Sequence, residues 1–529
     1  MTPYLVQHLL EHEAARSPTR ELLVTHEPES QRWSYRDADR AANRVAHALV
    51  AAGVTAGDRV AVLAHNGPGF VAGWFGALKA GAVVVPINSA IDPTSLAAQL
   101  TDCGARVLYL GARVERTVVA AGARLPAGLT VLVAPGAEAA ARALAAAAPA
   151  LTVRPGPSLL ELGPDDEAAA ARPPMVVRID RDPAAIIYTS GSTGRPRGAV
   201  LSHLALLSNC RSIVGYLGLG ADDRVLVVLP FYYVYGLSLL TTATAVGAAL
   251  VVENRFQYPA VALDTLAAEA CTGLAGVPST YAILVHRAGL AERALPSLRW
   301  VTQAGGGMSP ALTRALMGAL PGVRVHVMYG ATEASARLAH LPPAELAEAI
   351  GSIGYAIPNV ELTVRDDEGA PCAVDQVGEL FARGSNLMDG YWGDPDETTR
   401  VLGPHGYATG DLARRDAAGR LWLVGRKKDL LKVGGHRVAA REIEDAIADH
   451  PAVAEVAVIG VPDELLGDRL RAFVVRRPGA ELDGAGLGRF LRDRLAGYKI
   501  PEDIEWRDDL PKNPAGKVMK DALRPGGGA

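Results

Sequence analysis

The segment from Tyr188 to Gly198 concentrates side chains that can hold a phosphate group. It reads Tyr-Thr-Ser-Gly-Ser-Thr-Gly-Arg-Pro-Arg-Gly, and the apolar residues before it predict a strand that ends at Tyr188. Glycines let backbone N–H groups approach an anion, and hydroxyls donate hydrogen bonds to phosphate oxygens. The segment is not a Walker-type P-loop, because no Gly-Lys-Ser/Thr follows at the required spacing. Taken alone, a Gly/Ser cluster of this kind indicates only a polar surface turn.

Further motifs follow this segment along the chain, and each on its own could arise by chance. The motifs are Gln303-Ala-Gly-Gly-Gly, Tyr329-Gly-Ala-Thr-Glu, Gly378-Glu-Leu with Gly390-Tyr-Trp, Tyr407-Ala-Thr-Gly-Asp, Gly425-Arg-Lys-Lys-Asp-Leu-Leu-Lys-Val-Gly-Gly, and Pro511-Lys-Asn-Pro-Ala-Gly-Lys. Together with the first segment they form an ordered series that resembles the superfamily of acyl-CoA synthetases, peptide-synthetase adenylation domains and luciferases. The resemblance implies an enzyme of this acyl-adenylate-forming superfamily, whose members join a carboxylic acid to AMP.

The resemblance implies individual roles in binding ATP and Mg²⁺. Glu333 would bind Mg²⁺, a hard cation that suits carboxylate and phosphate oxygens, and Thr332 would reach the α-phosphate. Asp411 would accept both ribose hydroxyls, with Arg426 nearby. Lys517 would bridge the attacking carboxylate and the α-phosphate, where charge grows in the transition state. The other ATP-binding or AMP-binding residues would be Thr189, Ser190, Gly191, Ser192, Thr193, Gly194 and Arg197 at the phosphates, and Gly305, Gly306, Gly307, Tyr329 and Gly330 towards the adenine.

The same resemblance implies a second half-reaction, in which a thiol takes the acyl group. Lys428 occupies the hinge position, where a small C-terminal domain would swing between an adenylating pose and a thioester-forming pose. Gly434 and Gly435 would line the tunnel for a pantetheine arm. The thiol would belong to coenzyme A or to the phosphopantetheine of a separate carrier protein. The segment from Gly425 to Gly435 reads more like acyl-CoA synthetases, which favours coenzyme A.

Two positions depart from the family pattern. Arg197 stands where the phosphate loop usually has Lys, which keeps the charge but changes the donor geometry. Tyr233, in the acyl-pocket motif, stands where the family often has His. An aromatic gate would be kept there, while any imidazole contact would be replaced by that of a phenol.

The acyl pocket would be lined by Tyr233, Val234, Ala275 and Gly276. Amino-acid-activating relatives carry an acidic residue at the place of Val234, and a buried ammonium without a counter-ion is costly. We therefore expect α-amino acids to be poor substrates. Aryl-acid relatives of the salicylate type place Asn there, so they are weakly disfavoured too. The small residues Ala275 and Gly276, with Gly305 and Gly306, suggest room for an elongated acyl chain.

Apolar runs alternate with helix-like stretches through most of the chain, which predicts an α/β fold. Such alternation indicates βαβ units in largely parallel sheets covered by helices. The Ala/Gly/Pro-rich segment 120–171 is expected to form surface helices and loops. The runs that predict strands are residues 59–63, 82–86, 185–188, 224–229, 249–252 and 298–302.

The chain is long enough for more than one domain. After Gly378, the apolar runs become shorter and turn-forming residues become frequent. We expect a large N-terminal AMP-binding domain over residues 1–426, which holds the acyl and ATP sites. A smaller mobile α/β domain over residues 427–529 would carry Lys517. Its expected elements are a helix at 442–450, strands at 453–459 and 471–475, and a helix at 484–495.

Composition excludes several classes of protein. A net charge of −4 implies no strongly basic face, which argues against a nucleic-acid partner. The four cysteines are widely separated, which argues against a zinc site or a disulfide framework and fits a reducing cytoplasm. No signal peptide or integral membrane segment is evident. The pair His8 and His12 has metal-binding spacing, but a surface helix is the better interpretation. Glycines in the segment from Gly215 to Gly220 indicate a turn.

These observations favour an ATP-dependent acid–thiol ligase. It would convert a carboxylic acid, with a fatty acid as the first expectation, to acyl-AMP and then to acyl-CoA, releasing pyrophosphate and AMP. One alternative is a stand-alone adenylation enzyme that loads an acyl, aryl or amino acid onto a separate carrier protein. An alternative of another class is a non-catalytic adenylate-binding protein, which the presence of both Glu333 and Lys517 disfavours.

Overall fold

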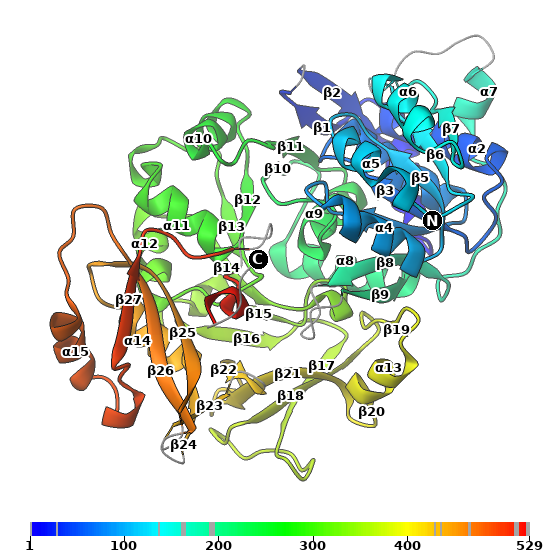
Figure 1. Ribbon diagram of the computed structural model, residues 1–529. Coiled ribbons are helices and arrows are strands. Elements are labelled where there is room, and N and C mark those ends of the chain that lie inside the picture. Colours follow the sequence, from blue (N-terminus) through cyan, green and yellow to red (C-terminus); the bar gives the residue numbers. More distant parts are fainter. Residues whose placement is uncertain are drawn as a thin grey trace.

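The computed structural model places the first large sheet in the N-terminal part of the chain (Figure 1). The structure describes residues 3–27, 30–135, 138–159, 166–189, 196–427, 430–433, 436–463, 467–512 and 518–524. The sheet has the order β19-β9-β8-β4-β3-β5-β6-β7, and only β9 and β19 among its described strands run antiparallel to their neighbours. Its strands are β3 (Arg59–Leu63), β4 (Val83–Ile87), β5 (Ala105–Leu110), β6 (Thr130–Val133), β7 (Thr152–Pro155), β8 (Pro183–Thr189), β9 (Arg197–Ser202) and β19 (Gly390–Tyr391).

Helices cover both faces of this sheet. One face packs on side chains from α2 and α3, and the other packs on side chains from α4, α5 and α6. Helix α2 begins with a capping box, in which the Ser34 hydroxyl accepts from the Asp37 backbone N–H and the Asp37 carboxylate accepts from the Ser34 N–H. The helices are α2 (Tyr35–Ala51), α3 (Pro68–Lys79), α4 (Pro93–Asp102), α5 (Glu115–Ala121), α6 (Glu138–Ala147) and α7 (Asp166–Ala171).

The expectation of helices and loops over residues 120–171 is wrong for two short stretches. Strands β6 and β7 lie within it and extend the parallel sheet at its edge. Strand β6 is only four residues long but is buried along Val131 to Val133. An apolar run of that length is too short to stand out against Ala-rich and Gly-rich neighbours, so only pairing with β5 defines it.

The second large sheet joins a parallel part to an antiparallel part. Strands β1, β11, β10, β12, β13 and β14 are parallel, and β15, β16, β22, β21, β18 and β17 continue the sheet in antiparallel pairs. The shorter apolar runs that begin after Gly378 therefore include strands of this antiparallel part. The strands are β1 (Glu21–Thr25), β2 (Gln31–Ser34), β10 (Arg224–Val227), β11 (Ala249–Val252), β12 (Gly273–Gly276), β13 (Trp300–Gln303), β14 (Arg324–Tyr329), β15 (Ala339–Leu341), β16 (Ser352–Ala356), β17 (Val360–Arg365), β18 (Gly378–Gly384), β20 (Leu402–Gly403), β21 (Gly406–Arg415) and β22 (Leu421–Arg426).

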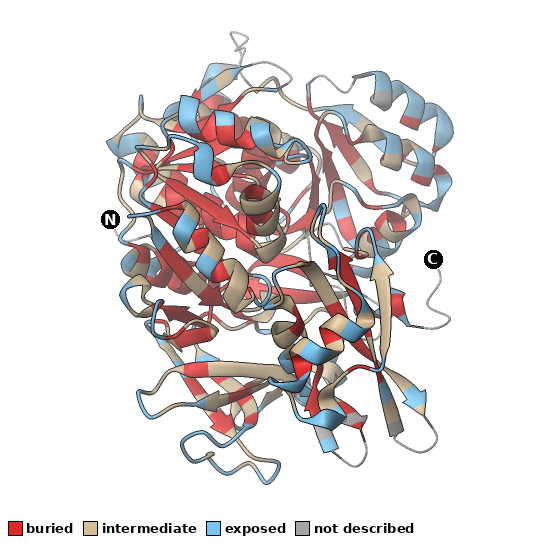
Figure 2. Ribbon diagram, turned by 90° about the vertical axis from the view of Figure 1, so that its left-hand side faces the viewer, coloured by how far each residue is buried: buried red, intermediate tan, exposed pale blue. Residues whose placement is uncertain are grey.

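The parallel part brings predicted site residues to one edge. Gly276, Gln303 and Tyr329 end the neighbouring strands β12, β13 and β14, and the carboxyl ends of parallel strands form the usual ligand-binding edge of an α/β sheet. Figure 2 shows that buried residues concentrate in the strands, while the outer helices carry exposed residues. The helices packed around this sheet are α1 (Gln7–Arg16), α8 (His203–Leu217), α9 (Val234–Val246), α10 (Pro259–Ala268), α11 (Pro278–His286), α12 (Pro310–Ala319) and α13 (Pro395–Val401).

The C-terminal elements form a smaller sheet of order β24-β23-β26-β25, with β27 paired to β26 (Figure 1). Its two apolar clusters draw all their buried members from Leu431 to Leu523, which supports a separate domain. The boundary at 426/427 and the mobility of this domain stay predictions. The elements are β23 (Leu430–Val433), β24 (His436–Ala439), α14 (Ala440–Ala448), β25 (Val453–Asp463), β26 (Gly467–Arg476), α15 (Gly484–Arg492) and β27 (Asp503–Arg507), which include all four expected ones.

The structure also locates the sequence features to which no function was assigned. His8 and His12 lie on α1, and no group of metal-binding side chains is found among the described residues. Gly218 ends α8 in the left-handed conformation that glycine favours, so the glycine-rich stretch is partly helix and partly turn. All four cysteines are free. Within the described part of the chain, no helix is both long and apolar enough to cross a membrane.

Candidate active site

Three residues predicted to hold the nucleoside meet at one carboxylate. The hydroxyl of Tyr329, at the end of β14, donates to Asp411 Oδ2 over 2.6 Å. Arg426 Nε lies 3.0 Å from Asp411 Oδ1, and the two residues are register partners on β21 and β22. Burial and the Asp411 charge hold the pKa of Tyr329 well above its usual range, so its hydroxyl remains a donor.

This geometry leaves Asp411 able to bind a further donor. A carboxylate offers about four lone-pair sites, and Tyr329 and Arg426 each take one. The carboxylate lies in a largely buried position, where hydrogen bonds to an ionised group are strong. The structure thus brings together residues that are far apart in sequence, in an arrangement suited to a pair of hydroxyls.

A second carboxylate, Glu333, is held by a residue to which the sequence analysis gave no role. Glu333 lies on the short 3₁₀ turn Thr332–Ala334, and its Oε1 accepts from the hydroxyl of Tyr391 over 2.7 Å. The Glu333 carbonyl also accepts from the Met388 N–H over 2.8 Å. Burial and the neighbouring Glu333 raise the pKa of Tyr391, so the phenol stays protonated. The Gly390-Tyr-Trp motif contained this residue, but only the fold shows what it touches.

Glu333 fits the predicted Mg²⁺ ligand. Its carboxylate forms no ion pair with any cationic side chain of the described residues, and Tyr391 occupies only Oε1. The second oxygen, Oε2, therefore keeps its lone pairs for a hard cation. Thr332 immediately precedes it on the same turn.

Arg197 lies at the base of the phosphate segment but is engaged elsewhere. Its Nη1 is 2.7 Å from Glu397 Oε1, and its Nε is 3.5 Å from Asp394 Oδ2, so α13 and its N-cap neutralise the charge. The guanidinium also lies 5.8 Å from the centroid of the Tyr391 ring. The predicted contact of Arg197 with ATP stays a prediction. The observed role of Arg197 is to join β9 to α13 beside the Tyr391–Glu333 pair.

The strands on either side of the phosphate segment are in antiparallel register, with Thr189 opposite Arg197. The Thr189 hydroxyl donates weakly to the Arg197 carbonyl over 3.4 Å. Several predicted residues lie outside the described residues: Ser190, Gly191, Ser192, Thr193 and Gly194 of this segment, Lys428, Gly434 and Gly435 of the hinge and tunnel, and Lys517.

The predicted adenine loop is shaped by close packing. The Gln303 side-chain amide donates to the Gly306 carbonyl over 2.6 Å, which fixes the path of the loop that contains Gly305. At Gly307, a Cβ atom would come within 2.3 Å of the guanidinium of Arg441 on α14, so this side chain of the small domain lies against the loop. At Gly330, a Cβ atom would meet the Ala336 carbonyl oxygen at 1.9 Å, so this position requires glycine.

The predicted acyl-pocket residues lie at the start of α9 and at the end of β12. Tyr233 caps α9, Val234 begins it, and burial raises the pKa of Tyr233. Ala275 is fully buried, and a Cβ atom at Gly276 would meet side chains of α11 at 3.0 Å. Thr280 and Tyr281 of α11 thus pack against Gly276, and the room for an elongated acyl chain stays a prediction.

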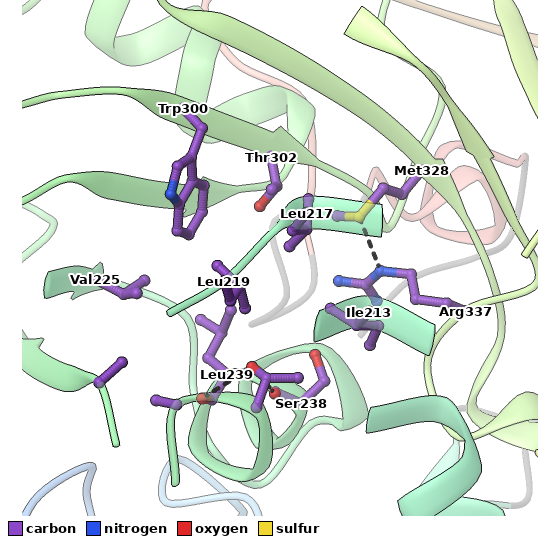
Figure 3. Close-up of a pocket in the computed structure, with 13 residues that line it drawn as sticks. Ile213, Leu217, Leu219, Val225, Ser238, Leu239, Trp300, Thr302, Met328 and Arg337 are labelled. Carbon is purple, nitrogen blue, oxygen red and sulfur yellow. Dashed lines mark hydrogen bonds between the residues drawn. The ribbon is translucent and has the colours of Figure 1, made fainter. Parts of the chain in front are cut away.

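A cluster of polar side chains beside α9 was not predicted from the sequence. The Tyr235 hydroxyl lies 2.9 Å from Thr302 Oγ1 and 3.5 Å from the Gly276 carbonyl oxygen, and the ring of Tyr235 faces the guanidinium of Arg337. Beside them is a cavity of about 10 Å³, near the lower limit that admits one water molecule (Figure 3). It lies between α8, α9, β13 and β14. Tyr235 follows Tyr233 by two residues in the acyl-pocket motif, whereas no sequence pattern indicated Arg337.

The fold, with Asp411 on β21 and Glu333 on the turn after β14, is that of an adenylate-forming enzyme. Two family models match the chain: AMP-binding enzyme over residues 10–392, and AMP-binding enzyme C-terminal domain over residues 442–517. The chain belongs to the AMP-binding enzyme family. This confirms the family predicted from the motifs.

Individual relatives resemble the chain over nearly its whole length. A feruloyl-CoA synthase of Amycolatopsis is 34% identical over 93% of both chains. An indoleacetate–CoA ligase of Aromatoleum aromaticum is 33% identical over 93% of this chain and 92% of its own. The crystal structure of the anthranilate CoA ligase AuaEII in complex with anthranoyl-AMP has a TM-score of 0.84 and 27% identity, covering 99% of this chain and 97% of that one.

Proposed function

We propose that the protein is an AMP-forming acid–CoA ligase. It activates a carboxylic acid with ATP and then transfers the acyl group to coenzyme A. The single observation that carries the proposal is the contact of Tyr329 and Arg426 with the carboxylate of Asp411, where Tyr329 lies four residues before Glu333 in the chain. The relatives named above are CoA ligases over almost the full chain.

The first half-reaction makes the mixed anhydride. One oxygen of the substrate carboxylate attacks the α-phosphorus of ATP, the bond from the α-phosphorus to the bridging oxygen breaks, and pyrophosphate leaves. Asp411 accepts the ribose hydroxyls, while the protonated Tyr329 keeps its hydrogen bond to that carboxylate. Glu333 would hold Mg²⁺, which supplies positive charge to the phosphate oxygens when bound. Lys517 would stabilise the charge that grows between the two reactants.

The second half-reaction makes the thioester. The sulfur of the thiol attacks the acyl carbonyl carbon, the bond between that carbon and the AMP oxygen breaks, and AMP leaves while the thiol proton passes to solvent. A movement about Lys428 would withdraw Lys517 and bring Gly434 and Gly435 to the site. The close approach of Arg441, on α14 of the small domain, to Gly307 supports the part of this proposal that brings the small domain to the adenine loop.

The acid is the open part of this proposal. The relatives named above act on aromatic acids, ferulate and indoleacetate, while fatty acids were the first expectation from the sequence. Val234 leaves a substrate ammonium without a counter-ion, so α-amino acids stay disfavoured. A panel of aromatic, alkyl and dicarboxylic acids therefore forms the first experiment, and α-amino acids serve as its negative arm.

Acid-dependent ATP–pyrophosphate exchange tests the proposal directly. We expect exchange with at least one acid of the panel. The absence of exchange with every acid of the panel would refute acid activation. Parallel reactions with coenzyme A and with a phosphopantetheinylated carrier protein then identify the acceptor, and we expect the free cofactor to be used. A cytoplasmic setting is part of the same proposal, and the four free cysteines support it.

Lys517→Ala separates the two half-reactions. Because Lys517 is assigned to the first transition state, we expect this variant to lose adenylation by about 10²-fold or more and to keep thioester formation from supplied acyl-adenylate. Both rates are measured on the same preparation. Lys520, which pairs with Glu444 on α14, gives the matched control Lys520→Ala, expected to leave both rates near the wild-type value. If Lys517→Ala lowered the rates of both half-reactions equally, this result would contradict the role assigned to Lys517.

A further inference from the structure

Arg441, on α14 of the small domain, lies against the predicted adenine loop, residues 303–307. A Cβ atom built at Gly307 would be 2.3 Å from Nη1, 2.4 Å from Cζ and 2.5 Å from Nη2 of Arg441. The end of the guanidinium that carries both Nη atoms therefore covers this glycine. The Arg441 side chain is only 24% exposed. The contact is thus part of the packing between the small domain and the large one.

The other side of the Arg441 guanidinium is paired within its own helix. Its Nε lies 3.5 Å from Asp445 Oδ2, one turn further along α14. Residues spaced by four are neighbours on a helix surface, so this pair aligns the side chain. Because both charges belong to α14, Arg441 keeps its counter-charge whether or not the helix touches the loop. The contact with Gly307 can therefore form and break without leaving a charge unpaired.

The adenine loop offers Arg441 a fixed and open surface. The Gln303 side-chain amide donates to the Gly306 carbonyl over 2.6 Å, which fixes the path of the loop. Gly307 does not have a positive φ, so its backbone conformation suits an alanine as well. A methyl group added at Gly307 would meet the guanidinium of Arg441 before any other side chain or backbone atom. The absence of a side chain at this position thus makes room for Arg441.

Helix α14 also contacts the turn that follows the predicted catalytic lysine. Glu444 Oε1 lies 2.7 Å from Nζ of Lys520, which belongs to the 3₁₀ turn Lys520–Leu523, and accepts from the Val458 N–H over 2.7 Å. Lys517 precedes Lys520 by three residues in the chain, and itself lies outside the described residues. One helix therefore lies between the adenine loop and the segment that follows Lys517. Both are assigned above to the first half-reaction.

A second contact of α14 with the large domain is weaker. Arg314 Nη1 on α12 lies 4.0 Å from Asp449 Oδ1 at the end of α14, and Figure 1 shows the small domain beside α12. These side chains are 62% and 38% exposed, and exposed ion pairs contribute little to stability. Arg441 is thus the better buried of the two contacts.

We propose that Arg441 is a positioning residue that holds the small domain against the adenine loop while the acyl-adenylate forms. This inference rests on the proposed function and assigns one contact to its first half-reaction. The movement proposed about Lys428 carries α14 away from the loop, so the contact breaks before the thioester forms. Loss of the contact slows the first half-reaction and does not slow the second.

Rates of the two half-reactions in Arg441→Ala test this role. With an acid that supports exchange, pyrophosphate release is measured in a single turnover, and thioester formation is measured from supplied acyl-adenylate and coenzyme A. We expect the first rate to fall by about threefold to tenfold, which is typical of losing one hydrogen bond or ion contact, and the second to stay at least at the wild-type value. Arg471, which pairs with Asp503 inside the small domain and is 26% exposed, gives the matched control Arg471→Ala. The control should change neither rate.

A double-mutant cycle with Gly307→Ala tests the contact itself. In the wild-type background, the added methyl group displaces the guanidinium, so Gly307→Ala should slow the first half-reaction about as much as Arg441→Ala does. In the Arg441→Ala background, the same methyl group has nothing to displace and should cause no further loss. Additive losses in the double variant would overturn the proposal. Equal slowing of both half-reactions by Arg441→Ala would make it a packing residue, and slowing of the second alone would assign it to the other pose; either result overturns the proposal, as does an unchanged first rate.

A distance measurement keeps the contact testable if the proposed function fails. Spin labels are placed at the exposed positions Ala294→Cys and Glu481→Cys, in a Cys372→Ser background, since the other three cysteines are buried. Electron paramagnetic resonance with ATP alone then gives the distribution of distances between the two domains. We expect a broader distribution in Arg441→Ala than in the labelled parent. The absence of exchange with every acid would refute acid activation, whereas identical distributions would overturn the positioning role of Arg441.

Discussion

The predicted nucleotide site and the buried region around Arg337 treat buried charge in opposite ways. At the nucleotide site, the carboxylate of Asp411 is compensated by Arg426 and by the Tyr329 hydroxyl before any ligand arrives. Around Arg337, the guanidinium has only neutral neighbours: the sulfur of Met328, the Ala336 carbonyl and the ring of Tyr235. An opposite charge compensates a buried ion more fully than neutral groups do, so the two regions differ in how much of the cost of burial the protein itself offsets.

The largest effect is expected from removing the carboxylate of the nucleotide site. Asp411→Ala would leave Arg426 and Tyr329 without their shared acceptor and would remove the predicted acceptor of the ribose hydroxyls. Since hydrogen bonds to a charged group contribute most among polar contacts, we expect kcat/KM for ATP to fall by about a hundredfold or more. The measurement is exchange at varied ATP. If the KM for ATP were unchanged in this variant, Asp411 with Tyr329 and Arg426 would have a structural role only. That result would contradict their assignment to the nucleotide site.

A pH experiment sharpens the comparison in the region around Arg337. His326 Nδ1 and His340 Nε2 are 2.9 Å apart, and burial lowers the pKa of His326 to about 3 and that of His340 to about 4, with the Arg337 charge also lowering the latter. An unfolded histidine titrates near pH 6.5, so the unfolded chain binds more protons below that pH. Stability should therefore be fully present above about pH 6.5 and fall as the pH drops, by about 2 kcal/mol per imidazole at pH 5.

Urea-unfolding midpoints at neutral pH and at pH 5 measure this loss. The double variant His326→Gln with His340→Gln should lose less stability between the two pH values than wild type. In Arg337→Met, one depressing charge on His340 is removed, so its pKa should rise and the loss should shrink slightly. An unchanged pH dependence in the double variant would show that other groups cause the acid sensitivity.

The smallest effect is expected from the residue that positions Glu333. Tyr391→Phe removes the hydroxyl that donates to Glu333 Oε1 and leaves the ring beside Arg197. Because a positioning residue acts through the metal ligand, we expect the Mg²⁺ concentration for half-maximal exchange to rise about threefold, which is typical of losing one hydrogen bond. Excess Mg²⁺ should restore the maximal rate. Glu333→Gln serves as the reference variant and should raise the Mg²⁺ requirement more.

A loss in Tyr391→Phe that no concentration of Mg²⁺ repairs would contradict this role. The residue would then act on folding or on the phosphate segment through Arg197. Thermal unfolding of the variant distinguishes these two cases, since the ion pair between Arg197 and Glu397 should persist when only the hydroxyl is lost.

Much of the fold could be read from local pattern. The apolar runs at 59–63 and 249–252 became β3 and β11, and the small C-terminal domain showed its helices and strands within a few residues of their observed ends. Patterns of this kind persist because one buried strand or helix face needs several apolar residues in a regular spacing. The short strands β6 and β7 could not be found in this way, since pairing with a neighbour defines them more than composition does.

The sequence by itself determined which residues define the family: the order of motifs placed Tyr329, Glu333, Asp411 and Arg426 as nucleotide-site residues, and family matches confirm that membership. Tertiary structure alone decided how charges are shared among them. It joined Arg197 to Glu397, Tyr391 to Glu333, and left Arg337 buried among neutral groups. The physical reason is that a motif records residue types along the chain, whereas compensation of a buried charge depends on which distant side chains the fold brings within a few ångströms.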